Sequence, residues 1–305
     1  MEHGLVVAKE TVRHALRVFD PDGVERRLRH RLQRRQYSGR GPNFLWHIDG
    51  YDKLKPFGFC IHGCIDGYSR RIMWLEVGTT NNDPAVVARY YVNCIREVGG
   101  TSRIVRANYG TENTFVAAIQ RFLRHNSDDS FTADKSFLYG RSVSNQRIEA
   151  WWAQLRKGCS NCWIDYFKSF RENGVYCDSN IIHVECLKFC YMDLIREELN
   201  RAARLWNNHR IRPSTKFSKS PAGRPDLLYS LPEISGTTDL IIKVENADID
   251  VCEHLLCSNS HQLNCSAEFS ALANIIMFEQ NLQMPNSPEE AKELYLALVD
   301  NIENI

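Results

Sequence analysis

Three short motifs carry side chains suited to metal-assisted chemistry on phosphodiesters. They supply Asp49, Asn108 and Glu149, within WHIDGYDKL, VRANYGTEN and NQRIEAWWAQLR. Cleavage or transfer of a phosphodiester needs an in-line nucleophilic oxygen and neutralisation of growing negative charge, and two Mg²⁺ ions held by converging carboxylates supply both. Mg²⁺ prefers oxygen ligands and keeps several waters, so few carboxylates suffice. These three positions are therefore the candidate catalytic and metal-binding residues.

Position 108 departs from that chemistry. A third acid is expected there, between Asp49 and Glu149, and the sequence has asparagine. A carboxamide oxygen binds Mg²⁺ weakly, and the substitution removes one negative charge from a site for two dications. We expect a rate loss of about 10³-fold or more, because each metal-bridging carboxylate stabilises the transition state by several kcal/mol. The pattern therefore predicts a strongly impaired catalyst.

Three other acids lie close to these motifs in the sequence. Of Asp52, Asp66 and Glu112, we regard Asp66 as the best-placed substitute ligand, because it ends a strand next to the strand of Asp49. The end of a neighbouring strand nevertheless points its side chain along a different line. A structural turn with Ser69 is the more ordinary role for Asp66.

The elements that must position these residues follow from hydrophobic patterning. The expected strands are 44–49, 58–66, 71–77, 103–107 and 136–139. A helix is expected after the third strand, with Asp83 as N-cap, Pro84 in its first position and Gly99 at its end. The other expected core helices are 111–125 and 144–157, with Ser144 as N-cap of the latter. Three meandering strands followed by crossover helices predict a mixed α/β sheet.

The second half of the chain is predicted to add elements to this core. They are helices at 163–170 and 182–206, a linker-like turn region at 223–232 and a strand pair at 240–251. Ser287, Pro288 and the acids that follow predict a terminal helix. The predicted segments are a basic N-terminal segment at 1–41, the core at 42–160, a helical extension at 161–225 and an acidic region at 226–305.

Charge is divided unevenly along the chain. Residues 226–305 hold fourteen acidic side chains against Lys243 and Lys292, and their net charge of −12 leaves +13 on residues 1–225, because the whole chain carries +1. Such a split is typical of a nucleic-acid-binding body with an acidic appendage. Segregated surface charge is the ordinary alternative. Docking of a protein partner is a further function for the acidic region.

Two N-terminal stretches are basic. Residues 4–17 predict a short turn followed by an amphipathic helix with Lys9, Arg13 and Arg17 on its open face. This helix is similar to the second helix of a helix-turn-helix that enters a DNA groove. A plain surface helix is an equally good interpretation. Residues 24–40 carry seven arginines, a density typical of phosphate contacts. A nuclear-localisation-type or merely solvated run is the ordinary alternative.

Several strings taken together resemble a known family. They are WHIDGYDKL, IDGYSR, GTEN, NQRIE and HRIRPS, the last at 209–214. The chain resembles the integrase core, the retroviral-integrase-like members of the DDE transposases with a ribonuclease-H-like fold, and most closely the eukaryotic transposon-derived type. The likeness covers about 44–160 and extends to about Tyr229. The triad of that family is Asp, Asp and Glu, and Asn108 stands where its second aspartate would be.

The resemblance implies a ribonuclease-H-like mixed sheet with a mainly helical C-terminal extension, Mg²⁺ or Mn²⁺ as cofactor, DNA as partner, action as a homo-oligomer and a nuclear location. On the third core helix, Arg147, Arg156 and Lys157 are candidate nucleic-acid contacts, since Arg156 follows Glu149 by seven residues and shares its face. Three functions remain open: an integrase- or transposase-like DNA-binding protein impaired by Asn108, an active Mg²⁺-dependent DNA integrase, and a non-catalytic interaction scaffold.

The cysteines and tryptophans have ordinary structural interpretations. Eleven cysteines, an odd number without a secretory signal, indicate reduced thiols inside a cell. The clusters around Cys159 and Cys186 lack a second pair of ligands at zinc-site spacing, so no zinc is predicted. Trp151 and Trp152 are interpreted as packing residues rather than base-stacking platforms. The sequence contains no apolar run long enough for a membrane helix, so no membrane association is expected.

Overall fold

The computed structural model describes residues 7–29, 39–213, 221–257 and 264–304. The described residues form two units, one of residues 7–29 and the other of residues 39–213 with 221–257 and 264–304. The larger unit contains all three candidate catalytic residues. It also contains most of the segments predicted as core, helical extension and acidic region.

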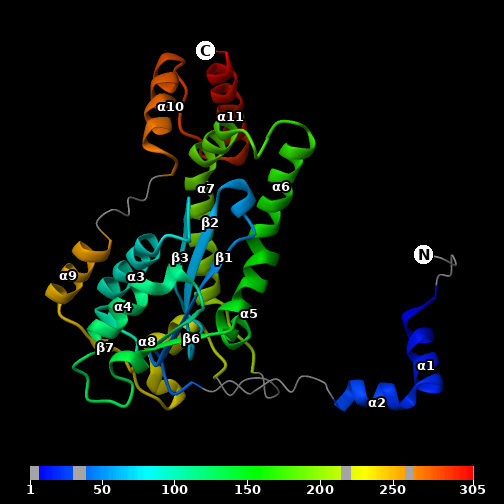
Figure 1. Ribbon diagram of the computed structural model, residues 1–305, viewed down its shortest axis with the longest axis vertical. Coiled ribbons are helices and arrows are strands. Elements are labelled where there is room, and N and C mark those ends of the chain that lie inside the picture. The colour runs from blue at the N-terminus through cyan, green and yellow to red at the C-terminus, as the bar shows by residue number, and fades with distance from the viewer. Residues whose placement is uncertain (1–6, 30–38, 214–220, 258–263, 305) are drawn as a thin grey trace. The chain divides into compact units, whose positions relative to one another are not determined.

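A mixed five-stranded sheet forms the centre of the larger unit (Figure 1). Its strands are β1 Leu45–Tyr51, β2 Cys60–Asp66, β3 Ile72–Gly78, β5 Ile104–Asn108 and β6 Phe137–Gly140. The order across the sheet is β3-β2-β1-β5-β6. The pairs β3–β2 and β2–β1 are antiparallel, whereas β1–β5 and β5–β6 are parallel. The five predicted strands and the mixed sheet are confirmed.

Helices cover both faces of this sheet. One face carries α3 Pro84–Val98 and α4 Thr114–Leu123, and the other carries α5 Gln146–Leu155, α6 Asn161–Glu172 and α7 Ile181–Asn208 (Figure 1). Successive side chains of a strand point to opposite faces. Trp46 of β1 therefore packs against Tyr91 of α3, whereas Tyr51 packs against Trp152 of α5. A hydrophobic core forms on each side of the sheet.

The ends of α3 follow the sequence prediction, and the start of α5 does not. The Asp83 side chain accepts a hydrogen bond from the amide of Ala85 at 2.8 Å, and Gly99 adopts a φ of 72° at the C-cap. Ser144 was the predicted N-cap of α5. That prediction is wrong, because Asn145 occupies the cap position and uses its side chain elsewhere.

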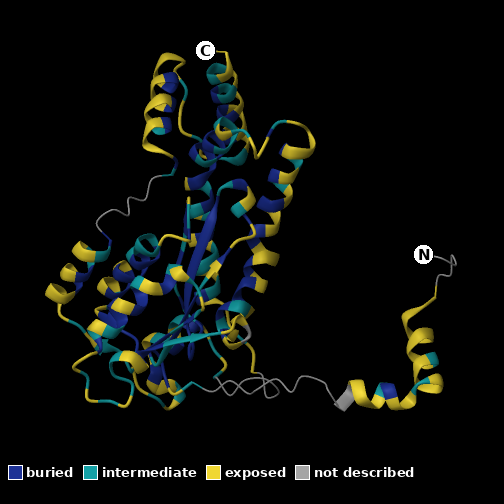
Figure 2. Ribbon diagram, viewed as in Figure 1, coloured by how far each residue is buried: buried dark blue, intermediate teal, exposed yellow. Residues whose placement is uncertain are grey.

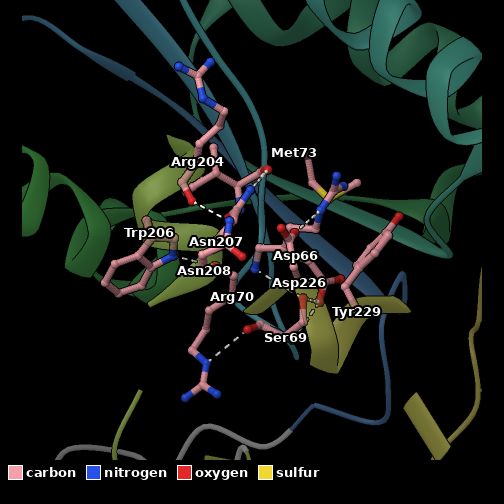
Figure 3. Close-up of polar contacts among 12 residues, drawn as sticks. Asp66, Ser69, Arg70, Met73, Arg204, Trp206, Asn207, Asn208, Asp226 and Tyr229 are labelled. Atoms are coloured by element: carbon pink, nitrogen blue, oxygen red, sulfur yellow. Dashed lines mark hydrogen bonds and ion pairs between the residues drawn. The ribbon is translucent and has the colours of Figure 1, made fainter. Parts of the chain in front are cut away.

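The helical extension is tied to the sheet through α7. Asn207 accepts a hydrogen bond from the amide of Ile72 at 2.8 Å and donates one to its carbonyl at 3.1 Å (Figure 3). Trp206 donates to the carbonyl of Arg70 at 2.7 Å. These side chains satisfy backbone groups at the start of β3 and in the turn before it. An open edge strand would invite pairing with another chain. The mainly helical extension predicted from the sequence is confirmed.

The acidic region is mostly helical and forms part of the larger unit. Its elements are α8 Pro225–Ser230, β7 Ile242–Lys243, α9 Asn246–Leu256, α10 Ala267–Glu279 and α11 Pro288–Glu303, and β7 pairs with β4 Gly100–Thr101. The terminal helix and its cap are confirmed, since Ser287 accepts a hydrogen bond from the amide of Glu290 at 3.2 Å. The linker predicted at 223–232 is wrong, because α8 occupies most of it. The strand pair predicted at 240–251 is also wrong, because β7 is the one strand in that segment and α9 begins at Asn246.

The smaller unit contains α1 Lys9–Phe19 and α2 Pro21–Arg29. The predicted N-terminal helix is therefore confirmed, and it continues two residues beyond its expected end at Arg17. Lys9, Arg13 and Arg17 are exposed, and Arg13 pairs with Glu10. Three of the seven arginines in the basic stretch, Arg31, Arg34 and Arg35, lie outside the described residues.

The cysteines and tryptophans occupy structural positions. All eleven cysteines are free thiols, and Cys186 and Cys190 are buried in one core. Trp151 packs against Trp206, and Trp152 is also buried, so the packing interpretation is confirmed for both. Among the described helices, none has the length and apolar character needed to cross a lipid bilayer.

Candidate active site

Asp49 and Asn108 lie side by side on neighbouring parallel strands. The pairing of β1 with β5 aligns Leu45 with Ile104 and His47 with Arg106. Side chains alternate between the two faces along a strand. Two residues beyond the His47–Arg106 pair, the same register brings Asp49 next to Asn108, on the face that α5 covers.

Both carboxylate oxygens of Asp49 accept hydrogen bonds from the protein. Nδ2 of Asn108 donates to Oδ1 at 2.6 Å, and Nε1 of Trp152 donates to Oδ2 at 3.0 Å. The other end of the Asn108 carboxamide, Oδ1, is buried and has no hydrogen-bond partner within the described structure. Asn108 therefore turns its donor toward Asp49, and the carboxylate of Asp49 is satisfied without a cation.

Glu149 joins this pair from the first turn of α5. The same helix brings Trp152 against Asp49. Gly63 of β2 lies opposite Asp49 in the sheet and leaves room for the indole, since a Cβ at Gly63 would lie 2.8 Å from the ring of Trp152. The glycine thus allows α5, and with it Glu149, to approach the sheet closely.

We expect Gly63→Ala to displace Trp152 and to lower the free energy of unfolding by about 2 kcal/mol, because an added methyl group overpacks a filled core. Urea unfolding followed by tryptophan fluorescence measures the change. Gly158→Ala is the matched control, since a Cβ at Gly158 meets no atom within 4 Å. The control should stay within about 0.5 kcal/mol of wild type. Equal stability of the two variants would contradict the close packing of Trp152 on Gly63.

The pKa of Asp49 is shifted strongly upward. Burial raises the pKa to about 7; the hydrogen bond from Trp152 opposes this increase, and the negative charges of Glu149 and Glu112 add to it. A carboxylate must be ionised to bind a metal ion. At neutral pH a cation therefore competes with a proton on Asp49 as well as with the two hydrogen bonds.

A pocket of about 500 Å³ adjoins these side chains. It is lined by Asp49, Gly50, Tyr51, Asp52, Lys53, Asn81, Asn82, Asn108, Glu112, Glu149 and Trp152. The structure thus brings the three sequence-predicted catalytic positions together. Glu112, from the GTEN string, and Trp152 are two further residues that line the site. From the sequence alone, Glu112 was one of three acids near the motifs, and Trp152 was given only a packing role.

Asp66 lies away from this pocket, at the other end of β2. It pairs with Trp46 in the sheet, is fully buried, and accepts hydrogen bonds from Asn43, Tyr68 and Ser69. Asp66 therefore stabilises the β2–β3 turn, as the structural interpretation predicted. The ranking of Asp66 as the best-placed substitute ligand is wrong, because Asp52 and Glu112 line the pocket instead.

A buried link between β1 and α5 holds the site together. Oδ1 of Asn145 lies 2.7 Å from Nδ1 of His47, and Nδ2 of Asn145 donates to the carbonyl of Ile48 at 2.8 Å. Burial lowers the pKa of His47 to about 3, so the ring is neutral at physiological pH. The link fixes the start of α5, four residues before Glu149, against the strand that carries Asp49.

The candidate nucleic-acid contacts fall in different places. Arg147 donates to the carbonyl of Gly67 at 3.0 Å and so supports the β2–β3 turn. Arg156 and Lys157 are exposed in the π-helical turn, Arg156–Ser160, that joins α5 to α6, and Arg156 donates to Asn161 at 3.2 Å. None of the three is among the described residues that line the pocket. Lys9, Arg13 and Arg17 belong to the smaller unit.

The side chains around Asp49 do not fit a pair of Mg²⁺ ions in this arrangement. A two-metal site needs carboxylates that are free to bridge the ions, and Asn108 and Trp152 hold the two oxygens of Asp49. Within the described parts of the chain, no group of three or more His, Cys, Asp or Glu side chains is placed to hold a metal ion. A cation near Asp49 can bind Oδ1 of Asn108 only after the carboxamide group rotates and presents that oxygen to it.

Comparison with known families supports the interpretation of the motifs. A family model described as integrase core domain matches residues 36–223. The match spans the five-stranded sheet, α5 and α7, and it includes the positions of Asp49, Asn108 and Glu149. A comparison with curated proteins found no match. The family match covers more than half of the chain, and the mixed sheet with flanking helices agrees with a ribonuclease-H-like fold. The chain therefore belongs to the integrase core domain family.

Proposed function

We propose that this chain is an integrase-like DNA-binding protein whose catalysis of DNA integration or transposition is strongly impaired by Asn108. Integrase core domains are integrase- and transposase-like polynucleotidyl transferases that generally bind DNA and use Mg²⁺ or Mn²⁺. The observation that carries the proposal is the 2.6 Å hydrogen bond from Asn108 to Asp49. A nuclear location, descent from a transposable element and action as a homo-oligomer belong to the same proposal.

The electrostatics of the Asp49–Asn108 pair supports impaired catalysis. An aspartate at position 108 would place two carboxylates within hydrogen-bond distance, where both ionise only if a cation lies between them. A metal ion relieves that repulsion and so binds favourably. Asparagine removes the repulsion and adds a hydrogen bond, so Mg²⁺ or Mn²⁺ binds weakly at this site. Loss of one ligand charge also weakens stabilisation of the transition state.

Exposed basic side chains support DNA binding. Lys9, Arg13 and Arg17 are exposed on α1, and Arg156 and Lys157 are exposed after α5. The chain outside its acidic region carries a large positive charge, as its sequence requires. Cations that neutralise phosphates release condensed counterions, which favours association with any DNA sequence.

An active Mg²⁺-dependent integrase is the second candidate, and the position of Glu112 favours it. Glu112 lines the same pocket as Asp49 and Glu149, so the pocket contains a third carboxylate although position 108 lacks one. Asn113 donates a hydrogen bond to Glu112 at 2.8 Å. This candidate requires Glu112 to act as a metal ligand. Glu112→Gln should then abolish cleavage by the wild-type chain.

A nicking assay on labelled duplex DNA tests the proposal. With Mg²⁺ or Mn²⁺, the wild-type chain should nick DNA no faster than Glu149→Gln, because the metal site is already defective. Both proteins should bind DNA with the same affinity, since Glu149 is not a phosphate contact. Faster nicking by wild type that Glu149→Gln abolishes would contradict impairment and favour the active integrase.

The DNA affinity of the full chain should fall steeply as salt is added. A protein that contacts six or more phosphates loses about 10³-fold in affinity between about 50 and about 200 mM salt. Fluorescence anisotropy with a labelled duplex measures the slope. Arg156→Ala and Lys157→Ala should each reduce the slope by about one contact, whereas Lys292→Ala in α11 should leave it unchanged. A flat dependence would contradict DNA binding by the basic part of the chain.

A further inference from the structure

α10 carries large apolar residues on two of its sides, and only one of these sides is buried. Phe269, Ala273, Ile276 and Met277 are its buried residues and pack into the core next to α7 and α11. A surface helix normally has a single apolar side, which faces the core. The opposite side of α10 is exposed in this chain (Figure 2).

The exposed side of α10 carries a row of large apolar residues. Leu272, Ile275 and Phe278 follow one another at three-residue spacing, so they lie along one side of the helix. Their exposed fractions are 36%, 57% and 88%. We call these three residues the α10 surface. Single exposed apolar residues are common, whereas a continuous row of them indicates an interaction site.

Acidic residues stand at both ends of the α10 surface. Glu268 precedes Leu272 by four residues, and Glu279 follows Ile275 by four, so each glutamate continues a row of the surface. Both glutamates are exposed. Across α10 and α11, seven acidic residues stand against one basic residue, Lys292. The ammonium group of Lys292 lies over the ring of a buried phenylalanine, 5.7 Å from its centre, rather than beside these glutamates.

Two of the three acids of α9, Asp250 and Glu253, are already paired within the chain. Arg96 of α3 donates to Asp250 and to Glu253, and Arg89 of α3 also pairs with Glu253. These contacts attach α9 to the core and neutralise its charge there. The negative charge around the α10 surface has no such neutralisation by an arginine of α10 or α11, because neither helix contains one.

We propose that the α10 surface binds an amphipathic helix of a protein partner, with apolar residues along one side and Lys or Arg at both ends of that side. The apolar residues cover Leu272, Ile275 and Phe278, and the basic ends pair with Glu268 and Glu279. A second copy of α10 is a poor occupant. Antiparallel pairing would bring Glu268 against Glu279 of the other copy, and parallel pairing would bring each glutamate against its own equivalent. Like charges placed opposite each other destabilise such a contact.

Binding of a synthetic peptide to the full chain tests this assignment. The probe is a fluorescein-labelled helical peptide of about 15 residues, with leucines at i, i+3, i+4 and i+7 and with lysines at both ends. We expect saturable binding by anisotropy, and a loss of at least about tenfold in affinity for the Ile275→Ser, Phe278→Ser double variant. Glu268→Gln with Glu279→Gln should weaken binding and reduce its dependence on salt.

Two controls distinguish binding at the α10 surface from non-specific binding of the peptide. Leu255→Ser removes an apolar residue of α9 that is 70% exposed, and it should leave the affinity unchanged. A peptide of the same composition in scrambled order should bind at least about tenfold more weakly. Circular dichroism checks that each variant is folded.

Two results would overturn the proposal. One is equal affinity of the peptide for wild type and for the double serine variant. The other is a wild-type dimer, by light scattering, that becomes monomeric in the double serine variant, because the α10 surface would then cover a second copy. The outcome is independent of the DNA-cleavage assays, since α10 lies outside the residues that line the candidate active site.

Discussion

Asn108→Asp is expected to increase the rate of Mg²⁺- or Mn²⁺-dependent nicking by about 10³-fold or more over wild type. The substitution replaces the amide that donates to Asp49 with a carboxylate. The two acids then repel each other until a cation binds between them, so the site regains both a ligand and the free energy that drives metal binding. Single-turnover nicking of a labelled duplex at matched protein and metal concentrations measures the change.

The double variant Asn108→Asp, Glu149→Gln is the control for this gain. It keeps the restored acid but loses the carboxylate of α5, so it should return to the wild-type rate. If Asn108→Asp gains nothing while it still binds DNA, position 108 is not the cause of the impairment. A gain that survives in the double variant would show that the cleavage does not use this site.

Asp66→Ala is expected to lower the free energy of unfolding by about 4 kcal/mol. Asp66 is fully buried and accepts hydrogen bonds from the amides of Asn43, Tyr68 and Ser69 and from the Ser69 hydroxyl. Alanine leaves these donors buried without an acceptor. Urea unfolding measures the loss. Asp66→Asn keeps one acceptor oxygen, so its free energy of unfolding should fall by less than that of Asp66→Ala. This variant provides a second measurement if the alanine variant does not fold.

The control for Asp66 is Asp226→Ala. Asp226 pairs with Arg71 at 2.8 Å, but its side chain is 39% exposed, so removal should cost no more than about 1 kcal/mol. Similar losses for the two alanine variants would contradict the structural role assigned to Asp66. A loss of metal binding in Asp66→Asn, with stability unchanged, would instead restore Asp66 as a ligand.

The sheet was predictable because its signals are local. Period-two alternation and short polar turns identify β1, β2 and β3, and the Asp83, Pro84 and Gly99 positions fix both ends of α3. The side-by-side placement of Asp49 and Asn108 also follows from the sequence, since neighbouring parallel strands align their carboxyl ends. These inferences need only neighbouring residues and the rules of strand pairing.

The failure at 240–251 involves contacts between distant residues. The segment 240–251 was predicted as a strand pair, yet only Ile242–Lys243 is a strand and α9 begins at Asn246. Arg89 and Arg96 of α3 pair with Glu253 and Asp250 and so attach this helix to the core. Tertiary contacts override β-propensity in such cases.

The same limit applies within the active site. Trp152 was correctly predicted to be buried, but its hydrogen bond to Asp49 joins residues 103 positions apart. His47 and Asn145, 98 positions apart, form the hydrogen bond that fixes the start of α5 against β1. The preference for Asp66 over Glu112 failed for a related reason. Strand order alone does not reveal that Asp66 lies at the opposite end of β2 from the pocket, which follows from its pairing with Trp46.

We propose above all that Asn108 replaces metal coordination of Asp49 by a hydrogen bond. Titration of Mn²⁺ into the full chain by isothermal calorimetry tests it most directly, with wild type and Asn108→Asp compared at the same pH. We predict that Asn108→Asp binds Mn²⁺ at least about 100-fold more tightly than wild type, a difference of about 2.7 kcal/mol. Wild type that binds Mn²⁺ as tightly as Asn108→Asp, with binding lost in Glu149→Gln, would contradict the claim.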